Sequence, residues 1–135
     1  MGMWVNTTST ANNQYLFGGW NDGPGVQFSM NVGSSTGKIN LYHSSFGRIN
    51  SATSVNDGKW HLVTWRYAKN GTFKIYIDGN EEASANFGTI NWNSWYWIIS
   101  ASGSSKSNGF IGSIDDVRIY SRVLSPSEIH DLSIQ

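Results

Sequence analysis

The chain has 135 residues, 39% of them hydrophobic and 14% aromatic, which is an ordinary size for one domain with a real core. Nine Lys and Arg balance nine Asp and Glu, so no basic field attracts phosphates and nucleic acid is excluded as an expected partner. The absence of cysteine excludes disulfides and thiolate zinc sites, and no apolar run is long enough to span a bilayer. We expect a single domain over residues 1–135.

Short β-rich runs alternate with turn residues along the chain. Ser, Thr, Asn and Gly dominate the polar positions while Lys and Glu are sparse, which disfavours helices and suits strands joined by turns. The predicted strands lie near residues 3–6, 14–18, 25–31, 38–43, 47–54, 60–68, 72–78, 95–101 and 110–120. This rhythm predicts an all-β sandwich or barrel.

Tryptophans stand in several of these runs. Strand alternation places Trp95 and Trp97 on one face, and we expect them to serve core and loop packing. We also assign Trp60 to the core. Trp92, which lies between two asparagines before its strand, is the better candidate for lining a sugar site.

One helical signal occurs near the C-terminus. Ser125, Pro126 and Glu128 supply an N-cap hydroxyl, a proline at the first helical position and a glutamate three residues past the cap. A short helix through about His130 or Leu132 follows from this pattern. We expect it to close one end of the fold.

Two segments resemble a known family. DGKWHLVTWRYAKNGTFKIYIDG (57–79) and GFIGSIDDVRIYSRVLSPSEI (109–129) are similar to the laminin G-like jelly-roll modules of the concanavalin A-like lectin and glucanase superfamily. The resemblance implies an antiparallel two-sheet β-sandwich that binds carbohydrate or protein-borne glycan, often with calcium, in a secreted or cell-surface protein. Family members usually begin one or two strands earlier, so we expect this chain to lack the family's first strand or strands.

The spacing of the carboxylates indicates whether the chain is an enzyme, because glycosidases of this superfamily carry Glu-x-Asp-x-x-Glu on one strand. The glutamates here are Glu81, Glu82 and Glu128, and no predicted strand offers that arrangement. The three histidines stand near no recognisable Ser or Cys triad, and we interpret His61 as a strand residue on a solvent-facing side. We expect a non-enzymatic protein.

A pair of carboxylates interrupts the apolar run at 112–120. Alternation places Asp116 beside Arg118, which predicts an ion pair or a surface position. Asp115 falls with aliphatic residues and has no partner in sequence, although a buried carboxylate needs one. Glucanases of the superfamily bind a structural calcium with an aspartate at the matching position, so the resemblance implies calcium at Asp115. A backbone N–H or a loop hydroxyl is the alternative partner.

The loop GGWNDGPG (18–25) is a second candidate site. Trp20, Asn21 and Asp22 place a stacking surface, an amide and a carboxylate together, which suits a sugar or a metal. Asn-Asp-Gly-Pro is also ordinary turn chemistry, and that interpretation stays open.

Two functions follow from the residues and the resemblance. The first is a lectin-like, carbohydrate-binding adhesion or targeting module, whose site residues are Trp20, Asn21, Asp22 and Trp92 and whose partner is a glycan or glycoprotein. The alternative is a structural or protein-interaction domain that forms homo-oligomers through an open sheet edge.

Overall fold

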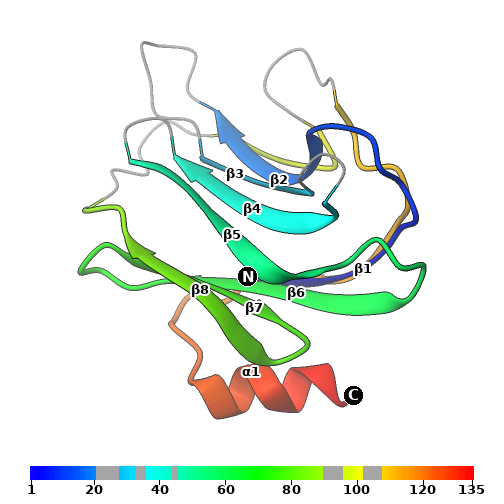
Figure 1. Ribbon diagram of the computed structural model, residues 1–135. Coiled ribbons are helices and arrows are strands. Elements are labelled where there is room, and N and C mark those ends of the chain that lie inside the picture. Colours follow the sequence, from blue (N-terminus) through cyan, green and yellow to red (C-terminus); the bar gives the residue numbers. More distant parts are fainter. Residues whose placement is uncertain (21–27, 33–35, 44–45, 90–95, 102–107) are drawn as a thin grey trace.

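In the computed structural model, two antiparallel β-sheets pack face to face, and a short helix lies outside one of them (Figure 1). The structure describes residues 1–20, 28–32, 36–43, 46–89, 96–101 and 108–135. The elements are β1 (Gly2–Asn6), β2 (Gln14–Trp20), β3 (Phe28–Val32), β4 (Lys38–His43), β5 (Gly47–Ser54), β6 (Trp60–Tyr67), β7 (Thr72–Ile77), β8 (Asn80–Asn86), β9 (Tyr96–Ile99), β10 (Ser113–Arg118) and α1 (Pro126–Ser133). The all-β sandwich prediction is confirmed. The sequence did not predict β8.

The strand order defines the two layers. One sheet has the order β10-β1-β6-β7-β8, and the other has the order β5-β4-β3-β2-β9. Neighbouring strands in both sheets run antiparallel. Strands β10 and β8 form the edges of the first sheet, and β5 and β9 form the edges of the second.

Alternation along the strands builds the core between the sheets. In β4, Ile39, Leu41 and His43 are buried, whereas the residues between them belong to the opposite face. In β7, Phe73 and Ile75 point the same way and are fully buried. The buried cluster consists of Met3, Val5, Leu16, Phe17, Val32, Ile39, Leu41, Val55, Val63, Phe73, Ile75, Ile77 and Phe87.

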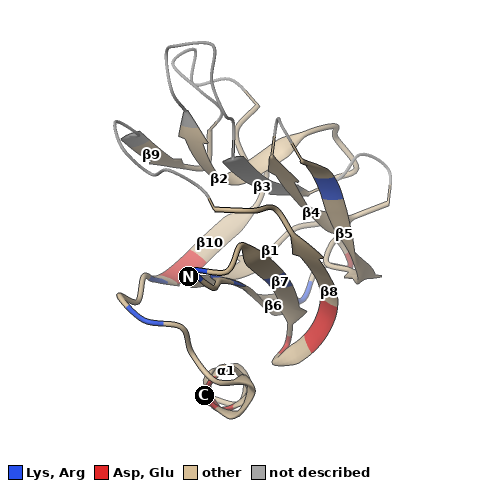
Figure 2. Ribbon diagram, turned by 90° about the vertical axis from the view of Figure 1, so that its left-hand side faces the viewer, with Lys and Arg blue, Asp and Glu red and all other residues tan. Residues whose placement is uncertain are grey.

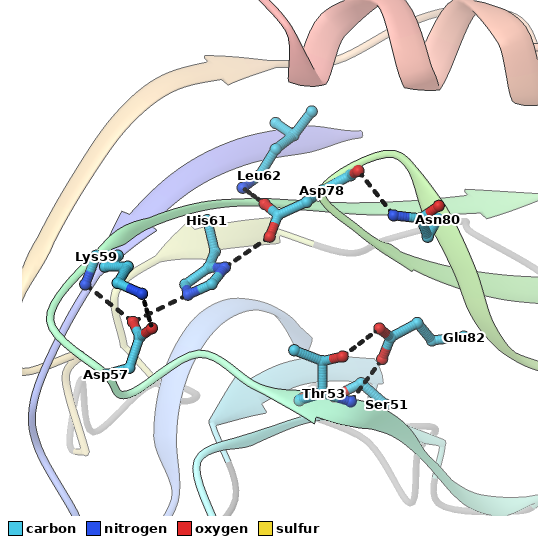
Figure 3. A network of polar contacts seen from close by, with 9 residues as sticks. All are labelled: Ser51, Thr53, Asp57, Lys59, His61, Leu62, Asp78, Asn80 and Glu82. Carbon is cyan, nitrogen blue, oxygen red and sulfur yellow. Dashed lines mark hydrogen bonds and ion pairs between the residues drawn. The ribbon is translucent and has the colours of Figure 1, made fainter.

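A polar contact ties the two sheets together along one side. Both carboxylate oxygens of Glu82 on β8 accept hydrogen bonds from Thr53 on β5, from its backbone N at 2.7 Å and from its hydroxyl at 2.5 Å (Figure 3). Since β8 and β5 are edge strands of different sheets, this contact joins the edges of the sandwich there.

The C-terminal helix forms at the predicted residues, but it does not pack at the end of the sandwich. Ser125 accepts a hydrogen bond from the Glu128 backbone N, and the Glu128 carboxylate accepts one from the Ser125 backbone N, so the capping box is confirmed. Ile129 is fully buried against Tyr76 and Leu124. Figures 1 and 2 show α1 on the face of the β6–β7–β8 sheet that points away from the other sheet. The expectation that it closes one end was wrong, because the outward-facing Tyr76 provides an apolar surface on that face.

None of the helical residues described here forms a segment that is long and apolar enough to cross a membrane.

Candidate functional site

Of the predicted sugar-binding residues, the structure describes the backbone of Trp20, at the end of β2 in the second sheet. Trp20 is the last residue of β2, and its Cα partner is Tyr96, the first residue of β9. The side chain of Trp20 and the residues Asn21, Asp22 and Trp92 lie outside the described part of the structure. The strands β2 and β9, which the predicted loops adjoin in sequence, pair with each other. The assignment of the four residues to one site stays a prediction.

A polar surface lies on the outer face of the same sheet, across β4 and β5. The register pairs Asn40 with Asn50 and Tyr42 with Arg48, so the four residues share the face opposite the core. Asn40 is buried at 5% exposure, Tyr42 is partly exposed, and Arg48 and Asn50 are exposed. We call Asn40, Tyr42, Arg48 and Asn50 the Arg48 surface.

Arg48 is held in place on this surface. Its Nη1 donates a hydrogen bond to Asn40 Oδ1 at 3.1 Å, and its guanidinium carbon lies 5.5 Å from the centre of the Tyr42 ring. That separation is within the range of a cation–π contact. The Asn40 amide is held in turn by the Lys38 backbone carbonyl, which accepts from Nδ2 at 3.3 Å. Two strands therefore position a planar guanidinium whose remaining N–H groups can serve a ligand.

The Arg48 surface was not identified from the sequence. The signal that could have revealed it is the alternation in KINLYH (38–43), where polar residues occupy every second position. The partner residues on β5 depend on the register of the hairpin, which has an irregularity between Lys38 and Asn40. Alternation alone does not give that register.

A second polar cluster surrounds His61 at the start of β6 (Figure 3). His61 Nδ1 lies 2.7 Å from Asp78 Oδ2, and Nε2 lies 3.0 Å from Asp57 Oδ1. The His61 side chain is only 12% exposed, so its interpretation as a solvent-facing residue was wrong. Both ring nitrogens are engaged by carboxylates. In the described part of the chain, these carboxylates are the hydrogen-bond partners of the ring, and no hydroxyl nucleophile is bonded to it.

An apolar groove of about 670 Å³ lies on another part of the molecule. Aromatic residues from both sheets line it, among them Phe17, Trp65, Tyr67 and Trp97, together with residues 119–124. Apolar area makes up most of its wall, although Thr64, Arg66, Lys69, Ser121 and Arg122 also line it. We prefer the Arg48 surface as the sugar site because its guanidinium and amide are held in defined positions by a hydrogen bond and a ring contact.

The family of the chain follows from comparison with known proteins. The family model described as the concanavalin A-like lectin/glucanases superfamily, of the laminin G type, matches residues 1–130. The chain belongs to this superfamily. The resemblance carried by residues 57–79 and 109–129 is thereby confirmed.

One curated relative and several solved structures are similar to the chain. The chain is 29% identical over 104 residues to the rat (Rattus norvegicus) sushi, von Willebrand factor type A, EGF and pentraxin domain-containing protein 1. The match covers 69% of this chain and 3% of that protein, so the chain spans a small fraction of its length.

Among solved structures, the CBM40 domain of the Ruminococcus gnavus IT-sialidase has a TM-score of 0.81 and 19% identity, over 98% of this chain and 80% of that one. Domain 4 of an extracellular arabinanase from Geobacillus stearothermophilus, in complex with arabinotriose, has a TM-score of 0.79 and 24% identity, over 98% of this chain and 64% of that one. Domains LG4-5 of the mouse laminin alpha1 chain have a TM-score of 0.59 and 16% identity, over 83% of this chain and 30% of that one. These likenesses establish the fold.

The carboxylate pair Asp115 and Asp116 lies on the exposed edge strand β10. Arg118 binds both oxygens of Asp116, with Nε at 2.8 Å and Nη2 at 2.6 Å, which confirms the predicted ion pair. Asp115 is exposed, and its Oδ1 accepts a hydrogen bond from the Asp116 backbone N at 2.7 Å. The premise that burial forces Asp115 to find a partner was therefore wrong.

Calcium at Asp115 was implied by the resemblance. Across the described residues, no group of three or more His, Cys, Asp or Glu side chains is arranged to hold a metal ion. A site at Asp115 would have to draw its other ligands from backbone carbonyls or water, because its neighbouring carboxylate is bound to Arg118. Calcium there stays a prediction.

Two tryptophan assignments differ from the structure. Trp60 is 46% exposed, so its assignment to the core was wrong. Its Cα partner is Asn6, the last residue of β1, and the pair lies at the end of the sheet where the core does not reach. Trp97 stacks on the buried Phe17, with ring centres 4.9 Å apart, yet is 39% exposed. Trp95 lies outside the described residues.

Proposed function

We propose that the chain is a non-catalytic carbohydrate-binding module that serves adhesion or targeting. The observation that carries the proposal is the Arg48 guanidinium, held over the Tyr42 ring and bonded to Asn40 on the outer face of a rigid sheet. Guanidinium and amide groups bind sugar hydroxyls in defined directions, and aromatic faces accept sugar C–H groups. Strands hold such groups in fixed positions, which reduces the ordering cost of binding.

Strand pairing connects this surface to β2, at whose end the predicted loop begins. The Tyr42–Arg48 pair is one position from His43 and Gly47, which pair at the same end of the sheet as Phe28. Phe28 in turn pairs with Gly19, next to Trp20. We therefore assign one extended site to the Arg48 surface together with the predicted Trp20, Asn21, Asp22 and Trp92.

Similar proteins support the ligand class. The arabinanase domain was solved with arabinotriose, and the CBM40 domain was solved with α2,3- and α2,6-sialyllactose. The ligands belong to those proteins, and for this chain they support a glycan or glycoprotein as partner. The extracellular arabinanase likewise supports a secreted or cell-surface location.

A glycan array followed by titration calorimetry tests the site. Arg48→Ala should weaken binding of any glycan found by about tenfold, because a hydrogen bond to a charged group contributes roughly 1.5 kcal/mol. The matched control is Arg118→Ala, which removes the same side chain from the other sheet. Circular dichroism verifies that both variants fold.

The outcomes separate the parts of the site. Loss of binding in Trp20→Ala or Trp92→Ala, with no loss in Arg48→Ala, would restrict the site to the loops. Equal binding by all three variants and the parent would refute the site assignment. Absence of binding across a broad array would refute the proposed function.

Calcium at Asp115 is a separate proposal with its own test. A ligand that binds only the folded state raises the unfolding midpoint, so excess calcium should raise it relative to excess chelator. The shift should disappear in Asp115→Asn and persist in Asp22→Asn. The opposite pattern would assign the ion to the loop at 18–25.

A second candidate function is a protein-interaction domain that forms homo-oligomers through an open sheet edge. Apolar side chains exposed on or next to the edge strands β9 and β10 favour it, because Ile99 is 46% and Ile119 is 72% exposed. Light scattering on a size-exclusion column measures the mass. A monomer across a wide concentration range would argue against this candidate.

A further inference from the structure

The His61 cluster joins two turns that are distant in sequence. Asp57 lies in the turn between β5 and β6, and Asp78 lies in the turn between β7 and β8. Asp78 has a φ of 49° and precedes Gly79 at 81°, the left-handed pair that a tight hairpin requires. This turn brings Asp78 beside β6, where its Oδ1 also accepts the Leu62 backbone N at 2.8 Å.

The imidazole of His61 occupies the space between the two carboxylates (Figure 3). It lies 2.7 Å from Asp78 and 3.0 Å from Asp57, through its two different nitrogens. A neutral imidazole has a single N–H and can donate to only one of them. The other nitrogen would then point a lone pair at a carboxylate oxygen. Only the imidazolium form satisfies both contacts.

The surrounding charges agree with this geometry. Burial lowers the pKa of His61, but hydrogen bonds and charge from Asp78 and Asp57 raise it more, and the net direction is upward. The pKa of Asp57 is lowered by hydrogen bonds from the Lys59 backbone and from His61. Lys59 Nζ lies 3.5 Å from Asp57 on the same turn, and His130 of α1 lies against Gly79 on the other turn.

The two carboxylates differ in how firmly they are held. Asp78 makes the shorter contact with His61, and its second oxygen is fixed by a strand backbone N–H. Asp57 makes the longer contact, and its oxygen also accepts the Lys59 backbone N within its own turn. When the His61 ring loses one proton, the contact with Asp57 should therefore break and the contact with Asp78 should remain.

The turn that carries Asp57 supports the end of β1. The Gly58 backbone N donates to the Thr7 carbonyl at 3.0 Å, and the Gly58 carbonyl accepts from Asn6 Nδ2 at 3.0 Å. Any movement of this turn thus reaches the segment that leaves β1.

We propose that His61 is a proton-dependent latch between the β5–β6 and β7–β8 turns. In its protonated form it binds Asp57 and Asp78 together and holds both turns against β6. In its neutral form it keeps Asp78 and frees Asp57, which loosens residues 56–59 and their contacts with β1. The latch is closed at low pH and opens as the pH rises through the raised pKa of His61.

Amide hydrogen exchange measured by NMR tests the latch on the whole chain. The reporter is the Lys59 amide, which donates to Asp57 Oδ1 at 2.9 Å. The control is the Thr72 amide, which makes the same kind of turn contact with Asn70 Oδ1 at 3.1 Å and has no histidine among its partners there. The ratio of the two rates cancels the general effect of pH on exchange.

Opening should raise the Lys59-to-Thr72 ratio by about tenfold, the loss expected for one charge-assisted contact. The midpoint should coincide with the titration of the His61 ring nitrogens. His61→Gln can donate to one carboxylate and does not titrate, so the step should vanish. Asp57→Asn keeps an oxygen for Lys59 but lacks the charge, so the step should move to lower pH.

A constant ratio across the titration of His61 would overturn the latch, as would a step that persists unchanged in His61→Gln. Should His61→Gln fail to fold, Asp57→Asn decides the matter. An unchanged midpoint in that variant would show that Asp57 is not coupled to the ring.

Discussion

The position of α1 on the outer sheet face gives a quantitative prediction for Ile129→Ala. Ile129 is fully buried against Tyr76 and Leu124, and the substitution removes three buried carbons. At about 0.8 kcal/mol per carbon, the lost transfer free energy is about 2.4 kcal/mol. The cavity that remains adds to this, so we expect a loss of about 3 kcal/mol in the free energy of unfolding. The equilibrium constant should change by roughly 150-fold.

Urea unfolding followed by far-UV circular dichroism and tryptophan fluorescence measures this loss. The matched control is Ile134→Ala, the same substitution at the helix C-cap, where the side chain is 72% exposed. It should change the free energy by less than about 0.5 kcal/mol. Equal midpoints for the two variants would refute the assignment of Ile129 to a stabilising contact. Faster amide exchange in α1 with an unchanged global midpoint would show that the helix detaches independently of the sheets.

Three further predictions concern local structure. Gly71→Ala should destabilise by more than Gly47→Ala, because both have positive φ but the added carbon meets the Gly88 carbonyl oxygen only at Gly71; thermal unfolding compares them. Ser125→Ala should cost about 1 kcal/mol in urea unfolding through loss of the cap. Arg122 and the cap lower the pKa of Glu128 to about 2, so its contribution to stability is present above the unfolded pKa and is lost as the pH falls toward 2. Glu128→Gln should remove this acid-dependent loss. A step that stays in Glu128→Gln, or equal midpoints in the glycine pair, would contradict these arguments.

Signals that act over a few residues could be predicted from the sequence. The capping box depends on Ser125 and Glu128, three positions apart, and both contacts form. The strand over 38–43 depends on alternation within six residues, and its bounds match. Such features are determined by local geometry and by the need to bury one face.

Features that depend on a partner strand could not be predicted from the sequence. The sequence of β8, NEEASAN, has no aromatic or β-branched residue, and the segment is a strand because it pairs with β7 after the Asp78–Gly79 turn. The Arg48 surface requires the register between β4 and β5. The contact of His61 with Asp78 requires three strands to meet. Propensity carries no information about these pairings.

The carboxylate pair on β10 bears on the choice between the two candidate functions. Asp116 has a φ of 47°, and the register shifts there, since Trp4 pairs with Asp115 while Gly2 pairs with Arg118. An irregularity with charged side chains on an edge strand obstructs pairing with another chain. The pair thus protects β10, which leaves β9 as the open one of the two edge strands whose exposed apolar side chains favour oligomers. Ile99→Lys should then abolish any oligomer, whereas Val117→Lys on β10 should not; the masses come from light scattering. Loss in both variants would mean that β10 is open despite its charges.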